Sequence, residues 1–358
     1  GYRMKEFHPL TVERLERETK DSVRIALGVP EELSDEYQFS PGQHIPVEIT
    51  LDGKKLRRTY SICSAQGETP LEIGVRVQPG GQFSEFAASE LKVGDTIAAM
   101  PPSGQFHVNL DPANENDYVG FAAGSGITPI LSMMKSILTI EPKSRFVLFY
   151  GNRKQSTTMF IEDLYALKNL YPERVQLNFV FSQEEQEFEP MAGRLDGAKV
   201  RELYQHFGKG LHTTDCFVCG PDTMIKDVTE ALVDLGMPAE HIHSERFGVP
   251  RKGARPSASA ARAADQAEIT IIMDAHKRTF DMHRDDANIV DAAADNGIDL
   301  PYSCKGGVCA TCRCHVREGE VTMATNFGLE PWEVEKGFVL ACQSRPVSDS
   351  VTLDYDKT

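Results

Sequence analysis

The pattern of hydrophobic and polar positions changes twice along the chain, and the two changes divide it into three segments. Residues 1–111 carry short hydrophobic runs separated by Gly and Pro, a pattern that predicts short strands. A single short helix is expected near Ser84–Leu91. Short strands at this spacing are typical of an antiparallel β-barrel. The strands predicted in this segment include Ser22–Leu27, Gln43–Leu51, Leu71–Val77 and Asp95–Met100.

Residues 117–248 alternate strand-like runs with helix-like runs, and this alternation predicts a doubly wound, parallel α/β sheet. The expected strands are Tyr118–Ala123, Phe146–Tyr150, Val175–Phe181 and Asp215–Cys219. The expected helices run through Met134–Leu138 and over Phe160–Leu170, Val200–Phe207 and Asp222–Leu235.

The last part of the chain begins with a change in composition. Residues 249–267 are rich in Ala, Ser, Pro, Gly and Arg without a hydrophobic period, which predicts a flexible linker. Residues 268–358 open with two predicted strands, Glu268–Asp274 and Arg278–Met282. A helix near Asn288–Asp295 is expected to end at Gly297, a residue suited to the position after a helix.

The composition of the chain excludes some classes of function. The chain has 358 residues and a net charge of −15, which argues against nucleic-acid binding because phosphate contacts need clustered Lys and Arg. It has no run of 18 apolar residues, so no membrane span is expected, and its polar start does not resemble a signal peptide. We therefore expect a cytoplasmic protein. Eight cysteines in a reducing compartment point to metal or redox chemistry before disulfides.

The spacing of four cysteines predicts an iron–sulfur site. Cys304, Cys309 and Cys312 follow a C-x4-C-x2-C pattern, and 29 residues separate Cys312 from Cys342. This is the ligand spacing of plant-type [2Fe–2S] ferredoxins. Two glycines between the first two cysteines allow backbone N–H groups to approach the sulfurs.

The alternative metal site is a zinc ribbon, which needs two C-x2-C-like knuckles. Here the first gap is four residues and the fourth cysteine stands alone, so the cluster is favoured. Cys314 lies two residues beyond Cys312, and we interpret it as a residue that does not bind the cluster.

A second motif predicts a flavin site. Arg58-Thr59-Tyr60-Ser61 matches the R-x-Y-S motif of the ferredoxin–NADP⁺ reductase superfamily. On a strand, Arg58 can neutralise a pyrophosphate, Tyr60 can stack on the isoalloxazine, and Ser61 can hydrogen-bond near flavin N5. Gly80–Ser84 begin the predicted helix, whose free N–H groups can bind phosphate, although a simple turn explains these glycines equally well. The residues predicted to bind the flavin are Arg58, Thr59, Tyr60, Ser61, Arg76, Val77, Gly81, Gln82, Phe83 and Ser84.

A pyridine-nucleotide site is expected where strands of the parallel sheet end. A Gly-rich turn runs from Gly124 to Pro129 between a strand and a helix, and an ordinary strand–helix loop is the alternative interpretation. Cys219–Asp222 ends a later strand at the same edge of the sheet. Arg153 lies at the end of another strand. Its guanidinium can pair with the 2′-phosphate of NADPH, which favours NADPH over NADH. The residues predicted to bind the nucleotide are Gly124, Ser125, Gly126, Thr128, Arg153, Cys219, Gly220 and Pro221.

With these motifs in one order, the chain resembles the ferredoxin-reductase-type oxidoreductases that carry a C-terminal plant-type ferredoxin domain of β-grasp fold. The resemblance covers nearly the whole chain and is densest over Leu300–Cys314. It implies hydride transfer from NADPH to FAD, with Ser61, Cys219 and Glu245 as catalytic residues and Phe247 near the flavin ring, although Phe247 fits core packing equally well.

The resemblance also implies a partner. Electrons leave through the cluster to the oxygenase component of a diiron oxygenase, and the contact is expected to be transient. Related reductases serve Rieske oxygenases or hybrid-cluster proteins, and these remain alternatives, as does a regulatory subunit that binds flavin without turnover. Residues 268–358 carry nine basic and sixteen acidic residues, a net charge of −7 that would steer the domain towards a basic acceptor surface. The linker either lets this domain swing or is a passive tether.

Overall fold

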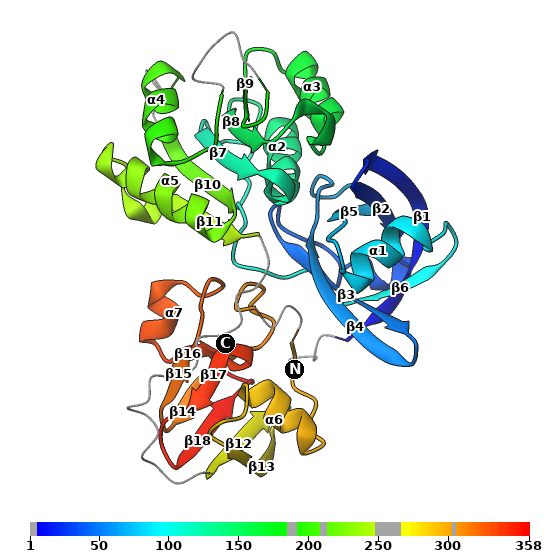
Figure 1. The fold of residues 1–358 in the computed structure, drawn as a ribbon, viewed down its shortest axis with the longest axis vertical. Coiled ribbons are helices and arrows are strands. Elements are labelled where there is room, and N and C mark those ends of the chain that lie inside the picture. Colours follow the sequence, from blue (N-terminus) through cyan, green and yellow to red (C-terminus); the bar gives the residue numbers. More distant parts are fainter. Residues whose placement is uncertain (1–5, 185–191, 208–212, 248–265, 303–305) are drawn as a thin grey trace.

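Three modules meet at a common junction in the computed structural model, which describes residues 6–184, 192–207, 213–247, 266–302 and 306–358 (Figure 1). Most of the predicted linker, and the predicted ligand Cys304, lie outside the described residues. The parts below are those that position the candidate site.

The N-terminal module is a six-stranded antiparallel sheet in the order β4-β3-β6-β1-β2-β5. A bridge between Ile62, directly after β4, and Ile73 of β5 joins the two edge strands, so the sheet closes into the predicted barrel. Helix α1 (Gln82–Ser89) packs against it and begins two residues earlier than expected. The strands are β1 (His8–Thr19), β2 (Ser22–Gly28), β3 (His44–Leu51), β4 (Lys54–Ser61), β5 (Leu71–Arg76) and β6 (Thr96–Ala99).

The second module is a five-stranded, all-parallel sheet in the order β11-β10-β7-β8-β9. Helices α2 and α3 cover one face and α4 and α5 the other, each pair with its own hydrophobic core, so the doubly wound prediction is confirmed. The strands are β7 (Asp117–Ala123), β8 (Arg145–Asn152), β9 (Val175–Phe181), β10 (Thr213–Gly220) and β11 (Ile242–Arg246). The helices are α2 (Ile127–Ile140), α3 (Ile161–Leu170), α4 (Gly197–Phe207) and α5 (Asp222–Asp234).

The C-terminal module is a mixed five-stranded sheet, in the order β13-β12-β18-β14-β16, beside a small β15–β17 ribbon. Helix α6 (Ile289–Asp295) is capped by Asn288, whose side chain accepts a hydrogen bond from the Asp291 N–H, and Gly297 follows it with φ +74° as predicted. Helix α7 (Pro331–Glu335) starts with a capping box. The strands are β12 (Gln266–Met273), β13 (His276–His283), β14 (Arg313–Glu318), β15 (Val321–Met323), β16 (Phe338–Leu340), β17 (Ser344–Pro346) and β18 (Ser350–Asp354).

Specific polar contacts join the barrel to the parallel-sheet module. Arg24 of β2 lies 2.7 Å from Asp163 of α3, and Lys135 of α2 lies 2.8 Å from the same carboxylate. The Ser132 hydroxyl donates to the Ser64 carbonyl at 2.7 Å. These buried or half-buried contacts hold helices α2 and α3 of the parallel-sheet module against the barrel.

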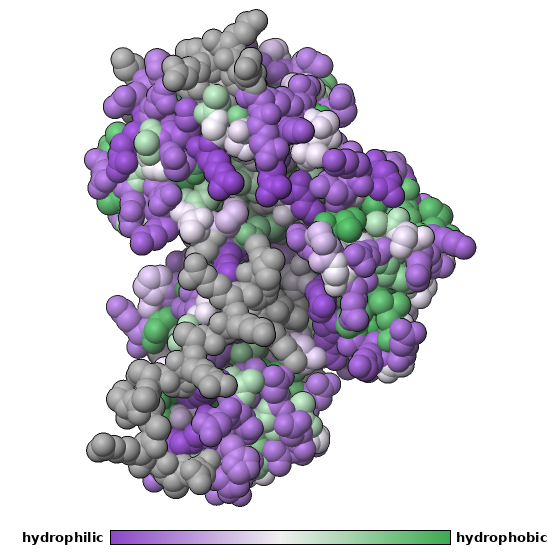
Figure 2. All heavy atoms as spheres, in the orientation of Figure 1, coloured by the Kyte–Doolittle hydropathy of each residue, from purple (hydrophilic) through white to green (hydrophobic). Residues whose placement is uncertain are grey.

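The surface is otherwise ordinary for a polar, acidic protein. The face shown in Figure 2 is mostly hydrophilic, with smaller hydrophobic areas over the barrel. Among the described helices, none is long and apolar enough to cross a membrane.

Candidate electron-transfer site

The predicted flavin motif lies on β4, at the edge of the barrel that faces the junction. Ser61 is 2% exposed, and its hydroxyl has no hydrogen-bond partner among the described residues. The Tyr60 ring lies 5.4 Å from the ring of Phe83 on α1. Burial raises the pKa of the Tyr60 phenol, against the opposing effect of the Arg58 charge, so the ring stays neutral and suits stacking. The arrangement fits a flavin that satisfies the Ser61 hydroxyl.

The start of α1 is the phosphate site that the sequence predicts, and its two glycine N–H groups are both occupied. Gly80 has φ +78° and donates its N–H to Glu85 Oε1 at 3.0 Å, while the Gly81 N–H donates to the Gln78 carbonyl at 2.8 Å. The Ser84 hydroxyl accepts the Gln78 N–H at 3.0 Å and so shapes the turn. The N–H groups of the first helical turn have no partner within the helix and point outward. Arg58, the cation of the predicted motif, lies on β4 and is exposed.

Arg76 connects the flavin motif to the nucleotide edge. Its Nη1 would lie 2.8 Å from a Cβ at Gly124, its Nη2 donates to the Thr157 carbonyl at 3.3 Å, and its buried Nε has no partner among the described residues. A guanidinium with unused donors beside a glycine turn suits an anionic ligand. Val77 contributes its N–H to the Asp21 carbonyl at 2.7 Å, so this backbone group is already occupied.

The two predicted nucleotide segments are brought into direct contact. Gly124–Gly126 form a short 3₁₀ turn before α2, and a Cβ at Gly126 would lie only 2.3 Å from the Cys219 carbonyl oxygen. Pro221 caps α5, with Gly220 immediately before it. The Thr128 hydroxyl donates to the Ser125 carbonyl at 2.8 Å and stabilises the turn. Two helix N-termini therefore meet at one sheet edge, which suits a pyrophosphate.

Arg153 follows the end of β8 and is exposed. Its carbonyl accepts the Gln183 N–H at 3.0 Å, which fixes the backbone while the guanidinium faces solvent. The residue therefore lies beside the carboxyl edge of the sheet, on the strand next to the Gly124 turn.

Cys219 and Glu245 are partners in register on β10 and β11. Burial, and then the charge of Glu245, raise the pKa of the Cys219 thiol well above its ordinary value, so it remains a neutral thiol. The Phe247 N–H donates to the Gly220 carbonyl at 2.7 Å, and its ring packs against the core of the module. Phe247 therefore packs against the core at a position next to the predicted nucleotide segment, and its place near the flavin ring stays a prediction.

Three of the four predicted cluster ligands are described, and all three are buried. Cys309 is 2%, Cys312 2% and Cys342 4% exposed. The Cys342 N–H lies 3.5 Å from the Cys312 sulfur. The hydrogen bond with Cys342, together with burial, raises the pKa of the Cys312 thiol well above its ordinary value. Gly307 has φ +76°, and its carbonyl accepts the Phe327 and Gly328 N–H groups, so the loop folds back on a neighbouring segment.

The donor set, which consists of thiols, fits a two-iron cluster. Such a cluster needs thiolates in pairs, and the Cys312–Cys342 contact supplies one such pair. The fourth candidate, Cys304, lies outside the described residues. Cys314 lies on β14 in the module's core, and burial raises its pKa to about 12.

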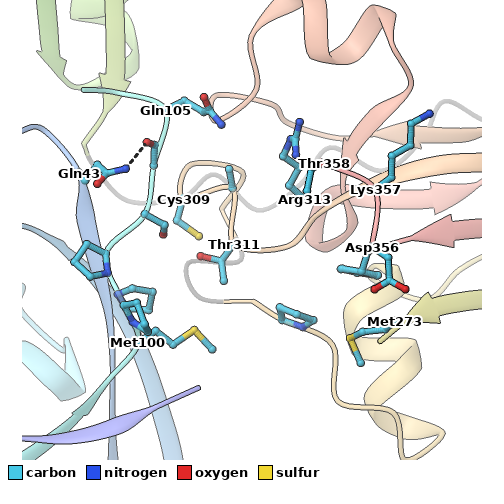
Figure 3. Close-up of a pocket in the computed structure, with 18 of the residues that line it drawn as sticks. Gln43, Met100, Gln105, Met273, Cys309, Thr311, Arg313, Asp356, Lys357 and Thr358 are labelled. Carbon is cyan, nitrogen blue, oxygen red and sulfur yellow. Dashed lines mark hydrogen bonds between the residues drawn. The ribbon is translucent and has the colours of Figure 1, made fainter. Parts of the chain in front are cut away.

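A cavity of about 400 Å³ separates the barrel from the cluster module. Figure 3 shows Cys309 and Thr311 of the cluster loop facing Gln43 and Met100 of the barrel side. None of the residues predicted to bind the flavin lines this cavity. It therefore marks the boundary between two modules rather than the flavin site.

Several junction residues were not predicted from the sequence. His44 of β3 lies between Glu245 and the Cys309 carbonyl. The Arg57 guanidinium lies 4.9 Å from the Tyr302 ring, and Arg246 lies 4.5 Å from the Phe327 ring. Each connects the cluster module to another module. His44 is the first residue of β3, a strand that also carries Glu48 and Thr50, so no local sequence signal distinguishes it.

Comparison with known families agrees with this geometry. Three family models match in order: an oxidoreductase FAD-binding domain over residues 9–108, an oxidoreductase NAD-binding domain over 121–230, and a 2Fe-2S iron-sulfur cluster binding domain over 271–347. The fold and site thus define a flavoprotein reductase of the ferredoxin–NADP⁺ reductase type with a [2Fe–2S] domain.

The chain belongs to the family of reductase components of oxygenases. It is 42% identical to a subunit of 1,2-phenylacetyl-CoA epoxidase from Escherichia coli, over 99% of both chains. It is 33% identical to the ferredoxin reductase component of 3-ketosteroid-9-alpha-monooxygenase from Rhodococcus rhodochrous, over 97% of this chain and 96% of that one.

Solved structures share the fold at lower identity. Phthalate dioxygenase reductase superposes with a TM-score of 0.59 and 21% identity, covering 97% of this chain and 98% of that one. An intact type IV self-sufficient cytochrome P450 monooxygenase gives a TM-score of 0.69 at 21% identity, covering 99% of this chain and 42% of the other. The three-module architecture predicted from the sequence is therefore confirmed.

Proposed function

We propose that this chain carries electrons from NADPH, through FAD and a [2Fe–2S] cluster, to a diiron oxygenase component that epoxidises the ring of phenylacetyl-CoA in phenylacetate degradation. The observation that carries this proposal is the 42% identity to the 1,2-phenylacetyl-CoA epoxidase subunit over 99% of each chain. A match over this length includes the surfaces that meet a partner as well as the cofactor sites.

The residues of the site divide the work among them. A flavin held at Arg58–Ser61 would supply the link between two-electron hydride chemistry and one-electron transfer to the cluster. Ser61 offers a buried hydroxyl to the reacting edge of the ring, and Tyr60 supports its face. The neutral thiol of Cys219 and the carboxyl group of Glu245 form one wall of the space for the nicotinamide. Because both are buried, they exclude water from that space.

We propose NADPH rather than NADH as the electron donor because of the residues that follow β8. Arg153 is exposed there and able to pair with a 2′-phosphate. The sequence that follows β8, Arg153-Lys154-Gln155, contains no acidic residue to hold a free ribose 2′-hydroxyl.

The partner contact is proposed to be transient and steered by charge. The cluster module, residues 268–358, carries a net charge of −7. This negative charge attracts a basic surface on the acceptor protein. We place the protein in the cytoplasm, without nucleic-acid or membrane partners. The proposed domains are 1–111 for FAD, 117–248 for the nucleotide and 268–358 for the cluster, joined by the linker 249–267.

Reconstitution tests the proposal. The holoprotein is combined in turn with candidate oxygenase components, each with its own substrate, and NADPH-dependent product formation is measured by mass spectrometry. We expect turnover with the phenylacetyl-CoA oxygenase and with no other oxygenase. Reduction of cytochrome c without turnover of any phenylacetyl-CoA oxygenase would leave the electron relay intact and refute the assigned partner. Arg153→Ala is expected to raise the KM for NADPH while the KM for NADH stays the same.

A further inference from the structure

The side chain of His44 contacts functional segments of both other modules. It belongs to β3 of the barrel, and its Cα is in register with Ser61 of β4. Its ring Nδ1 lies 3.4 Å from Oε1 of Glu245 on β11. Its Nε2 lies 3.0 Å from the carbonyl oxygen of the predicted ligand Cys309. One ring therefore joins the flavin barrel, the nucleotide module and the cluster loop.

The position of this ring is fixed by the backbone around it. The His44 N–H and carbonyl both pair with Ser103, at 2.9 Å each, on the side opposite to Ser61. Gly104, with φ +127°, passes directly under the ring, where a Cβ would lie 2.9 Å from the ring Cε1. The side chain is 3% exposed. Because the ring is held this tightly, a group that hydrogen-bonds to it is held at a fixed position relative to the barrel.

The direction of the hydrogen bond follows from chemistry. A carbonyl oxygen only accepts, so Nε2 carries the hydrogen and donates it to Cys309. The bond holds the Cys309 main chain against His44, which lies directly across the ladder from Ser61. Displacement of a loop by as little as about 1 Å disturbs the alignment of reacting groups.

We propose that His44 is a positioning residue that holds the cluster-binding loop against the flavin barrel and thereby sets the rate of electron transfer from flavin to cluster. In each transfer one electron leaves the flavin and one enters the cluster. The inference rests on the proposed electron relay, and it assigns to the barrel a residue outside the flavin motif whose role is directed at the cluster.

Two substitutions separate the two contacts of the ring. In His44→Gln the side-chain amide nitrogen occupies the place of Nε2 and keeps the donation to Cys309. In His44→Asn the shorter amide reaches the place of Nδ1, so the contact with Glu245 remains and the contact with Cys309 is lost. Asp299→Asn is the matched control, because Asp299 is 82% exposed and lies 4.0 Å from Arg57 at the same module boundary.

Stopped-flow spectroscopy follows flavin reduction by NADPH and the subsequent cluster reduction separately. We expect cluster reduction to slow by roughly tenfold or more in His44→Asn relative to flavin reduction, and to recover in His44→Gln and stay unaltered in Asp299→Asn. Hydrogen exchange gives a readout independent of turnover, and the peptide over residues 306–311 should lose protection in His44→Asn alone.

The failures of the two proposals are distinguishable. If the wild-type cluster is not reduced by NADPH, the relay itself is wrong. If the wild-type relay works but His44→Asn and His44→Gln match it in cluster reduction and in loop protection, His44 is an ordinary buried residue and the inference is refuted. Equal slowing in both variants also refutes it, since the Cys309 contact would then not be the cause.

Discussion

Gly126 and Cys219 lie in backbone contact, because a Cβ atom at position 126 would come within 2.3 Å of the Cys219 carbonyl oxygen. A backbone atom cannot move aside as a flexible side chain can. Gly126→Ala must therefore separate the two nucleotide segments. We expect the variant to lose roughly 100-fold in kcat/KM for NADPH, measured by ferricyanide reduction.

Gly197→Ala is the control for this prediction. A Cβ at Gly197, at the start of α4, would meet its nearest neighbours at 3.4 and 3.6 Å, which are ordinary contacts. Its kinetics should match those of the wild type. A Gly126→Ala protein with unchanged nucleotide kinetics would show that these segments do not hold the nucleotide.

Ser61→Ala tests the flavin contact. The wild-type hydroxyl is buried and has no partner among the described residues, so its removal should not lower the stability of the flavin-free chain. Flavin reduction by NADPH should fall by at least roughly tenfold, because the ring loses a polar contact at its reacting edge. Ser64→Ala gives the opposite pattern: its hydroxyl accepts the Glu72 N–H at 3.0 Å, so stability falls while flavin reduction changes less.

Asp163→Asn tests the contact between the barrel and the nucleotide module. Burial raises the pKa of the Asp163 carboxyl, but the hydrogen bond from Arg24 and the charge of Lys135 outweigh it, and the pKa is lowered overall. A carboxyl whose pKa is lower in the folded state stabilises the protein above its unfolded pKa of about 4, and this contribution disappears as the pH falls through the folded pKa.

We therefore expect Asp163→Asn to reduce the free energy of unfolding by about 1–3 kcal/mol at neutral pH, and the difference from wild type to shrink in acid. Urea denaturation at several pH values measures it. The neighbouring exposed Glu162, changed to Gln, should show little effect at any pH. A pH-independent loss in Asp163→Asn would contradict the assigned ion pair.

Buried thiols outside the cluster should resist alkylation. Burial raises the pKa of Cys63 to about 12 and that of Cys219 well above its ordinary value. The unreactive thiol form therefore predominates at neutral pH. Peptide mapping after iodoacetamide treatment should find both residues unlabelled in the native holoprotein and labelled after unfolding. Labelling of either one in the native state would show that it is accessible and ionised.

Local sequence patterns predicted the modules and most elements, because strand and helix periods and the cysteine spacing are local signals. β1 was not among the predicted strands, since charged residues occupy much of Leu15–Thr19 and weaken its pattern. The junction could not be predicted in the same way. His44, Glu245 and Cys309 are far apart in sequence, and only the packing of three modules brings them together.

The iron and sulfide content of the purified holoprotein, with its EPR spectrum after reduction by NADPH, tests the central claim most directly. The account predicts about two irons and two acid-labile sulfides per chain, and a paramagnetic signal that appears on reduction and is lost in Cys342→Ser. A protein that holds one zinc ion, or contains no acid-labile sulfide, would contradict it.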